Sequence, residues 1–334
     1  FHGTPCFDVI SGEVVGSLEK SPPTFTDIFS CKLLSLASEN KNIVAITAAM
    51  PEGTGLHRFA EEYPERFFDV GIAEEHAIGF AAGLAHAGLK PYVAIYSTFL
   101  QRSYDQILEE MCLQNLGVCL CLDRAGLVGE DGPTHHGIFD IAYLRSMPNL
   151  IVMAPADKED LEAMVEFAKG LEGPSSIRYP KDKAPFRPQT LAFSPVKAGR
   201  AEVLSEGSDV VLLALGSMVY PALEAAQILR DEKIHATVVN ARFVKPLDET
   251  LILDLYQRYP ALITVEEGVL KGGFGSAVLE LLEADGCIFK TPKLVKSLGL
   301  PCEFITFDKR ENLLEKYGLS PRAIARAVKD ALQK

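Results

Sequence analysis

Two adjacent carboxylates, Glu74 and Glu75, stand at the expected start of a helix over residues 73–87. Acidic side chains are common in a first helical turn because they interact favourably with the helix dipole, so a structural role is the simpler explanation. The rest of this helix is apolar on nearly every side. That pattern predicts a buried helix in which at least one carboxylate is withdrawn from water. A desolvated carboxylate is a candidate for acid–base chemistry.

The segment YSTFLQRSYDQ, residues 96–106, follows an expected strand and places Phe99 and Arg102 three residues apart at the start of a helix. Ligands of parallel α/β sheets bind beyond the carboxyl ends of the strands. An aromatic ring beside a cation at that position suits a flat heterocycle next to an anion. A core phenylalanine and a solvated arginine explain the same spacing equally well, so both interpretations stay open.

A glycine-rich loop, DRAGLVGEDGPTHHG at residues 123–137, has no usable hydrophobic periodicity. Loops of this length inside a compact domain are uncommon and usually functional. Its polar side chains are Asp123, Arg124, Glu130, Asp131, Thr134, His135 and His136. The two histidines are adjacent and lack metal-ligand spacing, which favours acid–base or hydrogen-bonding use of His135 over a metal site. Arg178, which ends a later strand, could bind a carboxylate or phosphate or form a surface ion pair.

The elements that would position these residues alternate along the chain between short apolar runs and helical spacing. The predicted strands of this first part cover residues 43–48, 67–70, 92–96, 118–122, 150–153 and 175–179. Helices are expected from Thr24, over residues 73–87 and 99–115, and around residues 161–168. This alternation predicts an α/β domain with a mostly parallel sheet.

A proline-containing linker at residues 181–196 separates this part from a second α/β series. The strands predicted there cover residues 210–215, 236–240, 262–265 and 294–298. Helices are expected after Gly216-Ser217, after residues 272–276 and from about Pro321. The KGGFGS segment at 271–276 lacks the third glycine of a dinucleotide fingerprint, so it indicates a tight helix entry. The sequence thus predicts two domains, each a mostly parallel sheet flanked by helices.

Composition narrows the classes of function. The 334 residues carry a net charge of −12, which disfavours nucleic acid and anionic membrane surfaces as partners. No apolar run approaches the roughly 18 residues of a membrane span, and no signal sequence is recognisable. The seven cysteines lack CxxC pairs, which favours reduced, mostly buried thiols and no zinc site. These features predict a cytosol-like compartment.

Seven segments carry a further signal: AITAAMPEGTGL (45–56), FFDVGIAEEHA (67–77), AIYSTFLQRSYDQ (94–106), DRAGLVGEDGPTHHG (123–137), IRYP (177–180), NARFVKPLD (240–248) and VEEGVLKGGFGSAVLE (265–280). Together they closely resemble the 1-deoxy-D-xylulose-5-phosphate synthase family, thiamine diphosphate enzymes of the transketolase superfamily. The resemblance spans almost the whole chain but only the latter half of the family's sequence. It implies a connector at 1–22, a pyrimidine-binding domain at 23–180, a linker at 181–196 and a C-terminal domain at 197–334. An N-terminal domain that binds the diphosphate and Mg²⁺ would be supplied in cis or in trans.

The resemblance also implies roles for single residues. Glu74 would hydrogen-bond the aminopyrimidine of the cofactor and act in proton transfer, Phe99 would stack on that ring, and Ile72 would contact it. His135 would orient a substrate hydroxyl as a second catalytic residue. The implied substrate-binding residues are Tyr96, Arg102, Arg124, Asp131, His135 and Arg178. The implied reaction condenses pyruvate with D-glyceraldehyde 3-phosphate to 1-deoxy-D-xylulose 5-phosphate and CO₂, in a homodimer with thiamine diphosphate and Mg²⁺. The implied location is the bacterial cytoplasm, with a plastid as the alternative.

Two departures from the family pattern and two alternatives remain. Glu75 stands where relatives more often have glutamine, and Phe307-Asp308-Lys309 replaces a His-Gly-Ser-like turn. The β subunit of a 2-oxo acid dehydrogenase has the same two-domain length, but the 123–137 loop followed by IRYP argues against it. A non-catalytic transketolase-like binding module is the other alternative, although it would not need the substrate-pocket residues. The chain alone is expected to fold and to be inactive.

Overall fold

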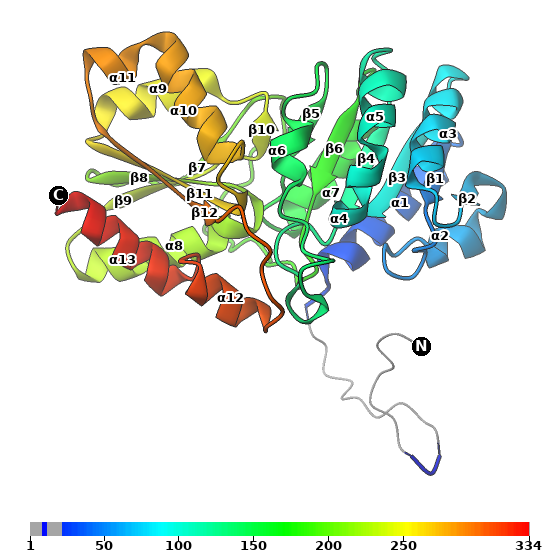
Figure 1. Cartoon of the computed structure of the whole chain (residues 1–334), viewed down its shortest axis with the longest axis horizontal. Coiled ribbons are helices and arrows are strands. Elements are labelled where there is room, and N and C mark those ends of the chain that lie inside the picture. The colour runs from blue at the N-terminus through cyan, green and yellow to red at the C-terminus, as the bar shows by residue number, and fades with distance from the viewer. Residues whose placement is uncertain (1–8, 12–21, 334) are drawn as a thin grey trace.

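The computed structural model describes residues 9–11 and 22–333, which form two lobes side by side, each built on one sheet (Figure 1). The expected connector at 1–22 lies outside the described residues, apart from 9–11 and 22. Parallel pairing predominates in both sheets, and helices cover both faces of each. The predicted α/β class with two mostly parallel sheets is therefore confirmed.

The first sheet has seven strands in the order β10-β5-β6-β4-β3-β1-β2. The strands are β1 (Ile43–Thr47), β2 (Phe67–Asp69), β3 (Lys90–Tyr96), β4 (Cys119–Asp123), β5 (Ile151–Met153), β6 (Ser175–Arg178) and β10 (Phe243–Lys245). Every neighbouring pair is parallel except β10 and β5. The carboxyl ends of the parallel strands therefore meet at one edge, where loops can build a site.

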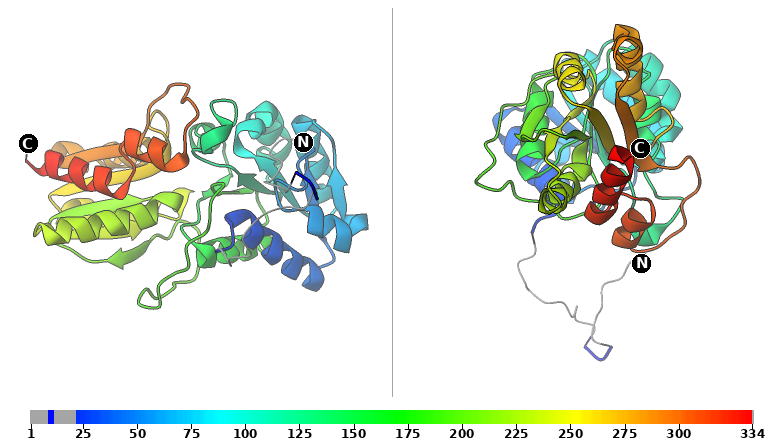
Figure 2. Two further views of the ribbon diagram at one scale, coloured as in Figure 1. Left: turned by 90° about the horizontal axis from the view of Figure 1, so that it is seen from below. Right: turned by 90° about the vertical axis from the view of Figure 1, so that its left-hand side faces the viewer.

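The helices of this lobe are α1 (Phe25–Glu39), α2 (His57–Glu62), α3 (Glu74–His86), α4 (Ser97–Leu100), α5 (Tyr104–Gln106), α6 (Asp140–Leu144) and α7 (Lys158–Lys169). A reciprocal capping box between Thr24 and Asp27 starts α1. The paired helices α1 and α7 cover one face of the sheet, and α3 and the α4–α5 segment cover the other (Figure 2).

The single helix predicted over residues 99–115 is wrong. The segment consists of α4, a 3₁₀ turn at Gln101–Ser103, α5, and a π-helical stretch at Ile107–Cys112. Apolar spacing cannot distinguish these forms because each stretch is only three to six residues long, too short for the different numbers of residues per turn to move the apolar face. The break begins after Leu100, so Phe99 lies in α4 and Arg102 in the 3₁₀ turn, and both have predicted site roles.

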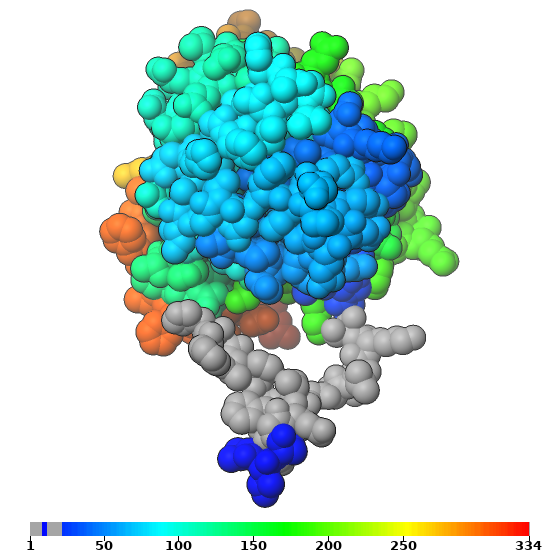
Figure 3. Space-filling view, turned by 90° about the vertical axis from the view of Figure 1, so that its right-hand side faces the viewer, coloured from blue at the N-terminus to red at the C-terminus, as the bar shows by residue number. Residues whose placement is uncertain are grey.

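Helix α3 is also less buried than its apolar sequence predicts. One face packs on the sheet through Ala77, Ile78 and Ala81, whereas Gly83 and His86 are exposed. This helix lies near β2, at the end of the lobe. The surface of that end is formed by residues coloured blue to cyan in Figure 3. In the first turn of α3, the Glu74 side chain is buried.

The second sheet has five strands in the order β12-β11-β8-β9-β7, with only the β7–β9 pair antiparallel. Its strands are β7 (Glu202–Ser205), β8 (Val210–Ala214), β9 (Ala236–Asn240), β11 (Ala261–Val269) and β12 (Leu294–Leu300). Its helices are α8 (Val219–Asp231), α9 (Glu249–Arg258), α10 (Phe274–Asp285), α11 (Cys287–Lys290), α12 (Arg310–Lys316) and α13 (Pro321–Leu332). In Figure 1, α8 and α13 lie below this sheet and α9, α10 and α11 above it.

The predicted helix start at Gly216-Ser217 is a 3₁₀ turn, and α8 begins at Val219. Ser217 does not cap the helix because its hydroxyl donates instead to the Glu267 carboxylate, at 2.6 Å. The Gly-Ser pair is typical of a helix cap, but the Ser217 hydroxyl binds the buried Glu267 of β11 instead.

The two lobes share an apolar core and one strand. Strand β10 follows the linker in sequence, yet it pairs with β5 of the first sheet, with Phe243 opposite Met153. Leu144 and Val152 of the first lobe and Val244 and Leu255 of the second belong to one continuous buried cluster. The lobes are consequently packed together along an apolar contact rather than joined only by the linker.

A buried group of charges reinforces this junction. Asp157 and Asp160 at the start of α7 face Arg187 of the linker, and Arg242 reaches both Asp160 and Glu202. Arg187 also pairs with Glu202, at 2.9 Å. Three carboxylates thus meet two guanidinium groups, which leaves one surplus negative charge inside the protein.

The six described cysteines are free thiols, of which Cys31 and Cys302 are exposed and the other four buried; Cys6 lies outside the described residues. No helix in the described part of the chain is long and apolar enough to cross a membrane.

Candidate functional site

A pocket of about 250 Å³ opens at the carboxyl edge of the first sheet. It is lined by Ala48, Ala49, Met50, Ile72, Glu74 and Phe99. These residues come from the turn after β1 and from the starts of α3 and α4. Asp69, at the end of β2, fixes the turn because its carboxylate accepts from the backbone N–H groups of Ala49 and Gly71. Adjacent strand ends therefore build the pocket.

Glu74 is 4% exposed, so the predicted desolvated carboxylate is confirmed. Arg102 reaches it across the pocket rim, with Nη1 3.2 Å from Oε2, and pairs through Nε with Glu75 at 3.0 Å. Arg102 Nη1 also donates to the Ile72 carbonyl. The backbone N–H of Glu75 and then Arg102 hold the pKa of Glu75 below its usual range. The extra carboxylate at position 75 is thus ionised and paired with Arg102.

Phe99 links this pocket to the other aromatic and basic residues with predicted roles. Its ring stacks on Tyr96, with centroids 5.7 Å apart, and meets the His135 ring edge-on at 5.4 Å. The Arg124 guanidinium lies over the opposite part of this cluster, 4.0 Å from the Tyr96 ring centroid. Partial burial raises the pKa of Tyr96. The structure therefore brings Glu74, Phe99, Tyr96, Arg124 and His135 into one continuous group.

The 123–137 loop is ordered by hydrogen bonds between its own two ends. Gly126 and Gly137 exchange backbone hydrogen bonds of 2.7 and 2.8 Å. Arg124 has a left-handed backbone, with φ of 58°, and its side chain donates to the Gly53 carbonyl and to Asp123. Further along, the Val128 N–H donates to Nδ1 of the buried His136. Of the two histidines, only His135 faces the aromatic cluster.

Asp131 lies on the outer part of this loop. Although burial raises its pKa, the pairing with Lys181 outweighs it and lowers the pKa of Asp131. The two side chains are 3.0 Å apart and both are substantially exposed. The hydrogen-bonding neighbour of Asp131 is therefore the linker lysine, and the nearby His135 and Arg124 lower its pKa further.

Arg178 lies deeper and is held by the junction between the lobes. Its side chain is 4% exposed, and Nε donates to Asp140 Oδ2 at 2.8 Å. Nη2 donates to the backbone carbonyl of Glu267, at 3.0 Å. The surface ion pair proposed as an alternative for Arg178 is wrong because both partners are buried.

Four residues at this site were not predicted from the sequence: Asp140, Lys181, Gly53 and Glu267. Gly53 lies in the 45–56 segment and Glu267 in the 265–280 segment of the family resemblance, but nothing in their local spacing assigns them a role. Gly53 has the clearest physical signal, because any Cβ at this position would collide with the Tyr96 hydroxyl. Each of the four acts through a contact made by folding between distant segments.

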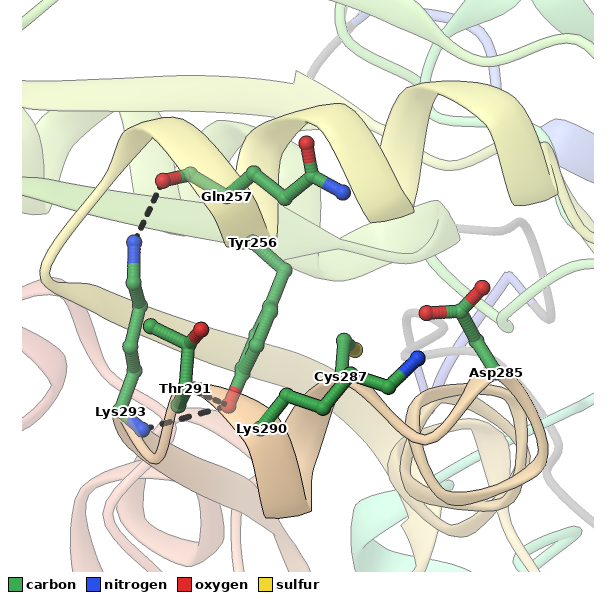
Figure 4. Close-up of a pocket in the computed structure, with 7 residues that line it drawn as sticks. All are labelled: Tyr256, Gln257, Asp285, Cys287, Lys290, Thr291 and Lys293. Atoms are coloured by element: carbon green, nitrogen blue, oxygen red, sulfur yellow. Dashed lines mark hydrogen bonds between the residues drawn. The ribbon is translucent and has the colours of Figure 1, made fainter.

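A larger hollow, of about 500 Å³, lies in the second lobe between α9 and α11 (Figure 4). None of the predicted site residues lines it. Its polar groups already bond one another: Lys293 donates to the Gln257 carbonyl, and the Tyr256 hydroxyl donates to the Thr291 carbonyl. The smaller pocket at Glu74 is the better candidate for a ligand site, since it combines a buried carboxylate, an aromatic ring and apolar walls.

Comparison with protein families divides the chain at its linker. Residues 21–187 match the transketolase pyrimidine-binding domain, and residues 199–324 match the transketolase C-terminal domain. The chain is 51% identical over 328 residues to 1-deoxy-D-xylulose-5-phosphate synthase 1 of Geobacter sulfurreducens, covering 98% of this chain and 51% of the relative. It is 48% identical over 334 residues to the synthase of Gloeobacter violaceus, covering 99% and 52%. The chain thus spans about half the length of the curated relatives it matches.

Solved structures share the fold. A chain described as "Split gene transketolase, inactive beta4 tetramer" superposes with a TM-score of 0.81 and 36% identity, covering 94% of this chain and 99% of that one. Transketolase from Campylobacter jejuni superposes with a TM-score of 0.75 at 22% identity, covering 94% and 48%. The resemblance inferred from the seven sequence segments is confirmed by these matches.

Proposed function

Because the chain belongs to the transketolase family, with its pyrimidine-binding and C-terminal domains, we propose that it forms the pyrimidine-binding half of a thiamine diphosphate site. One observation carries the proposal: the pocket at the edge of the first sheet, lined by the buried Glu74 carboxylate and the Phe99 ring. A flat ring fits such a pocket because apolar walls cover its faces and the carboxylate meets an edge nitrogen.

We propose further that the reaction is that of a 1-deoxy-D-xylulose-5-phosphate synthase, which condenses pyruvate with D-glyceraldehyde 3-phosphate and releases CO₂. Relatives about half identical across this chain carry that name. The loop at 123–137 and the IRYP segment resemble the same family. We place the enzyme in the cytoplasm, as a homodimer.

The residues around the pocket fit the cofactor's aminopyrimidine. When bound, thiamine diphosphate supplies the nucleophilic carbon that adds to pyruvate and the electron sink for loss of CO₂. Glu74 holds a proton at a ring nitrogen, since a buried carboxylate regains in that hydrogen bond the solvation it has lost. Phe99 and Ile72 cover the ring faces and exclude water.

The acceptor side is the basic group around the 123–137 loop. Arg102 is half-exposed at the pocket rim and can extend toward a phosphate. The described hydrogen bonds of Arg178 use Nε and Nη2, which leaves Nη1 for a ligand oxygen. Arg124, Tyr96 and Asp131 complete the proposed acceptor pocket, and His135 orients a substrate hydroxyl from its place beside Phe99.

We assign the diphosphate and Mg²⁺ to the N-terminal domain that the family likeness implies, in keeping with the half-length match to the curated relatives. That domain can be part of the same polypeptide or a separate subunit. The second arrangement has one specific support: the solved chain of the same extent is described as a split-gene transketolase.

The test is to supply the N-terminal domain, add Mg²⁺ and thiamine diphosphate, and measure CO₂ release and product formation from pyruvate and D-glyceraldehyde 3-phosphate. We expect turnover with pyruvate and only slow reaction when a ketose phosphate replaces it as donor. Turnover of the ketose phosphate alone would identify a transketolase, and turnover of neither would reject the proposed reaction.

A further inference from the structure

Glu267, in β11 of the second lobe, faces the proposed acceptor side of the first lobe. It is 1% exposed, and its carboxylate accepts four hydrogen bonds. Three come from its own lobe: Ser217 Oγ donates at 2.6 Å, and the two Arg310 nitrogens Nε and Nη2 donate at 3.1 and 2.5 Å. The fourth crosses the junction, from the backbone N–H of Leu127 at 2.9 Å.

That crossing contact falls in the middle of the 123–137 loop. Leu127 itself is fully buried among apolar residues of the second lobe. The preceding Gly126 has φ of 85°, and a Cβ there would lie 2.6 Å from Cδ of Glu267. Only a glycine therefore lets the loop backbone come close enough for the Leu127 N–H to reach the carboxylate.

The backbone of Glu267 holds a second group with a predicted role. Its carbonyl accepts from Nη2 of Arg178 at 3.0 Å, while Asp140 holds Nε of the same guanidinium. One residue of the second lobe thus contacts both the loop and the arginine that we assign to the acceptor. The carboxylate is kept in place by Arg310, which is itself anchored to Asp182 of the linker at 2.6 Å.

We propose that Glu267 is a positioning residue for the acceptor phosphate, holding the 123–137 loop and Arg178 at fixed separation from across the lobe junction. This inference rests on the proposed function. Arg310 pairs with both carboxylate oxygens of Glu267 and fixes their position. Breaking this pair would leave a buried charge without compensation, which is strongly unfavourable, so the carboxylate is a rigid acceptor for the loop. Removing the charge should loosen the middle of the loop around Leu127, while His135 stays packed against Phe99 and the cofactor pocket keeps its lining.

Glu266 supplies a matched control. It is the adjacent residue on the same strand and is equally buried, but its carboxylate accepts from the N–H groups of Phe274 and Gly275 at the start of α10. Among the described residues, the hydrogen bonds of its carboxylate stay within the second lobe. Glu266→Gln and Glu267→Gln replace adjacent buried carboxyl groups by the same amide, and only Glu267 accepts from an N–H of the loop. Burial raises the pKa of Glu266 to about 7, so the two variants are compared at pH 8, where native Glu266 is mostly ionised.

The first measurement is amide hydrogen exchange on this chain, resolved to residues. In Glu267→Gln the Leu127 amide should exchange at least about tenfold faster, since a hydrogen bond to a charged acceptor is weakened. Phe274 and Gly275 should keep their native rates. In Glu266→Gln these two amides should exchange faster and Leu127 should not. Unchanged Leu127 exchange in Glu267→Gln, or an equal rise at all three amides in both variants, overturns the proposal.

The second measurement is kinetic, on the protein with its N-terminal domain supplied. Glu267→Gln should raise KM for D-glyceraldehyde 3-phosphate about tenfold, with KM for pyruvate and kcat within about twofold of native. Glu266→Gln should change neither KM. A uniform loss of kcat overturns the positioning role. If the native protein does not use this aldehyde, the acceptor role falls with the proposed function, while the exchange rates still decide whether Glu267 holds the loop.

Arg310→Lys guards against a variant that does not fold. Lysine keeps the positive charge but loses the two-pronged grip on Glu267. We expect smaller changes of the same kind, in Leu127 exchange and in KM for the aldehyde. A well-folded Arg310→Lys protein with native values of both would also overturn the proposal.

Discussion

Glu74 and Glu75 are neighbours in sequence with different surroundings. Glu74 points into the pocket and is almost wholly buried, whereas Glu75 is partly exposed and pairs with Arg102 at the rim. Helical geometry separates them because successive side chains point about 100° apart around the axis. Only one of the two can therefore meet a ring bound in the pocket.

Replacing Glu74 with alanine should lower kcat by about 10²–10⁴ in the protein with its N-terminal domain, because the proton at the ring nitrogen loses its partner. Steady-state turnover checks this, with circular dichroism to establish that the variant is folded. Glu75→Gln is the matched control and should stay within a few-fold of native. Near-native turnover of Glu74→Ala would contradict the proposed role of this carboxylate.

The two arginines assigned to the phosphate should respond differently to substitution. Arg178→Ala leaves Asp140 buried without its partner, which should cost about 3–5 kcal/mol of unfolding free energy. Arg102→Ala removes a half-exposed guanidinium that pairs with the partly exposed Glu75 and with the buried Glu74, and should cost less, about 1–3 kcal/mol. Denaturant unfolding of both variants measures the difference, and equal losses would contradict it.

Both variants should weaken binding of the aldehyde phosphate more than binding of pyruvate, since each removes a charge-assisted contact to the phosphate. A selective rise in KM for pyruvate would instead assign the arginine to the donor carboxylate. For Arg178 the milder Arg178→Lys is the better kinetic variant because it keeps a positive charge beside Asp140.

At the scale of elements, strands were the easier prediction. The expected strand at 236–240 coincides with β9, and the expected strand at 43–48 exceeds β1 by one residue. A fully buried parallel strand is a continuous apolar run, which is visible locally. β10 was not predicted because three residues before a proline have no period, and the strand exists only through its pairing with β5 of the other lobe.

The helices show the limits of periodicity in another way. α9, which was not predicted, has Asp248 as its cap and buries Ile252, Leu255 and Tyr256. The spacing of these three residues is helical and is visible in the sequence. Residues 99–115 were predicted as one helix because their apolar spacing is helical. Its change from α to 3₁₀ to π hydrogen bonding depends on packing against α3 and the sheet.

Two glycine-to-alanine substitutions should have opposite effects. At Gly137 a Cβ would collide with the Arg124 carbonyl and with Ser97, so Gly137→Ala should lower the free energy of unfolding by about 1–3 kcal/mol. At Gly83, in α3, a Cβ meets nothing within 4 Å, and alanine should add about 0.5–1 kcal/mol through helix propensity. Urea denaturation of both variants tests this, and a neutral Gly137→Ala would mean that the loop ends are not closely packed.

For the molecule as a whole, the residue types at the site were predictable, but the way in which they are grouped was not. Glu74 and Phe99 meet as expected because each lies in the first turn of a helix, after β2 and β3, the two parallel strands that flank β1. Arg178 and Asp131 are different, since their positions depend on Glu267 and on Lys181. Contacts between the loop, the linker and the second lobe join residues 50 or more positions apart, which no local pattern records.

The chain alone should bind thiamine diphosphate weakly. It offers the pyrimidine pocket but, on our proposal, none of the groups that hold the diphosphate and Mg²⁺. Loss of several charge-assisted contacts should move the dissociation constant above about 1 mM. Calorimetric titration with thiamine diphosphate and Mg²⁺ measures it, with the protein carrying its N-terminal domain as the reference. Tight binding to this chain would show that the diphosphate ligands lie within it.

The buried charges at the lobe junction should make stability depend on pH. Burial and then the neighbouring Asp160 raise the pKa of Asp157 to about 6. A carboxyl whose folded pKa lies above its unfolded value of 3.8 stabilises the fold fully at low pH, and this contribution is lost as pH rises through about 6. Titration of Asp157 should therefore lower the free energy of unfolding by up to about 3 kcal/mol between pH 4 and pH 7.5.

Asp157→Asn removes this titration while keeping an oxygen that can cap α7; its amide NH₂ takes the place of Oδ2 and can donate to the Tyr220 hydroxyl. It also balances the junction, leaving two carboxylates with two guanidinium groups. The free energy of unfolding, measured by urea at intervals from pH 4 to pH 7.5, should fall less steeply in the variant than in the native chain. Asp254→Asn, at an exposed pair with Arg258 on α9, is the control and should follow the native curve. Parallel curves for Asp157→Asn and the native chain would mean that Asp157 stays ionised throughout, with Arg187 compensating its burial.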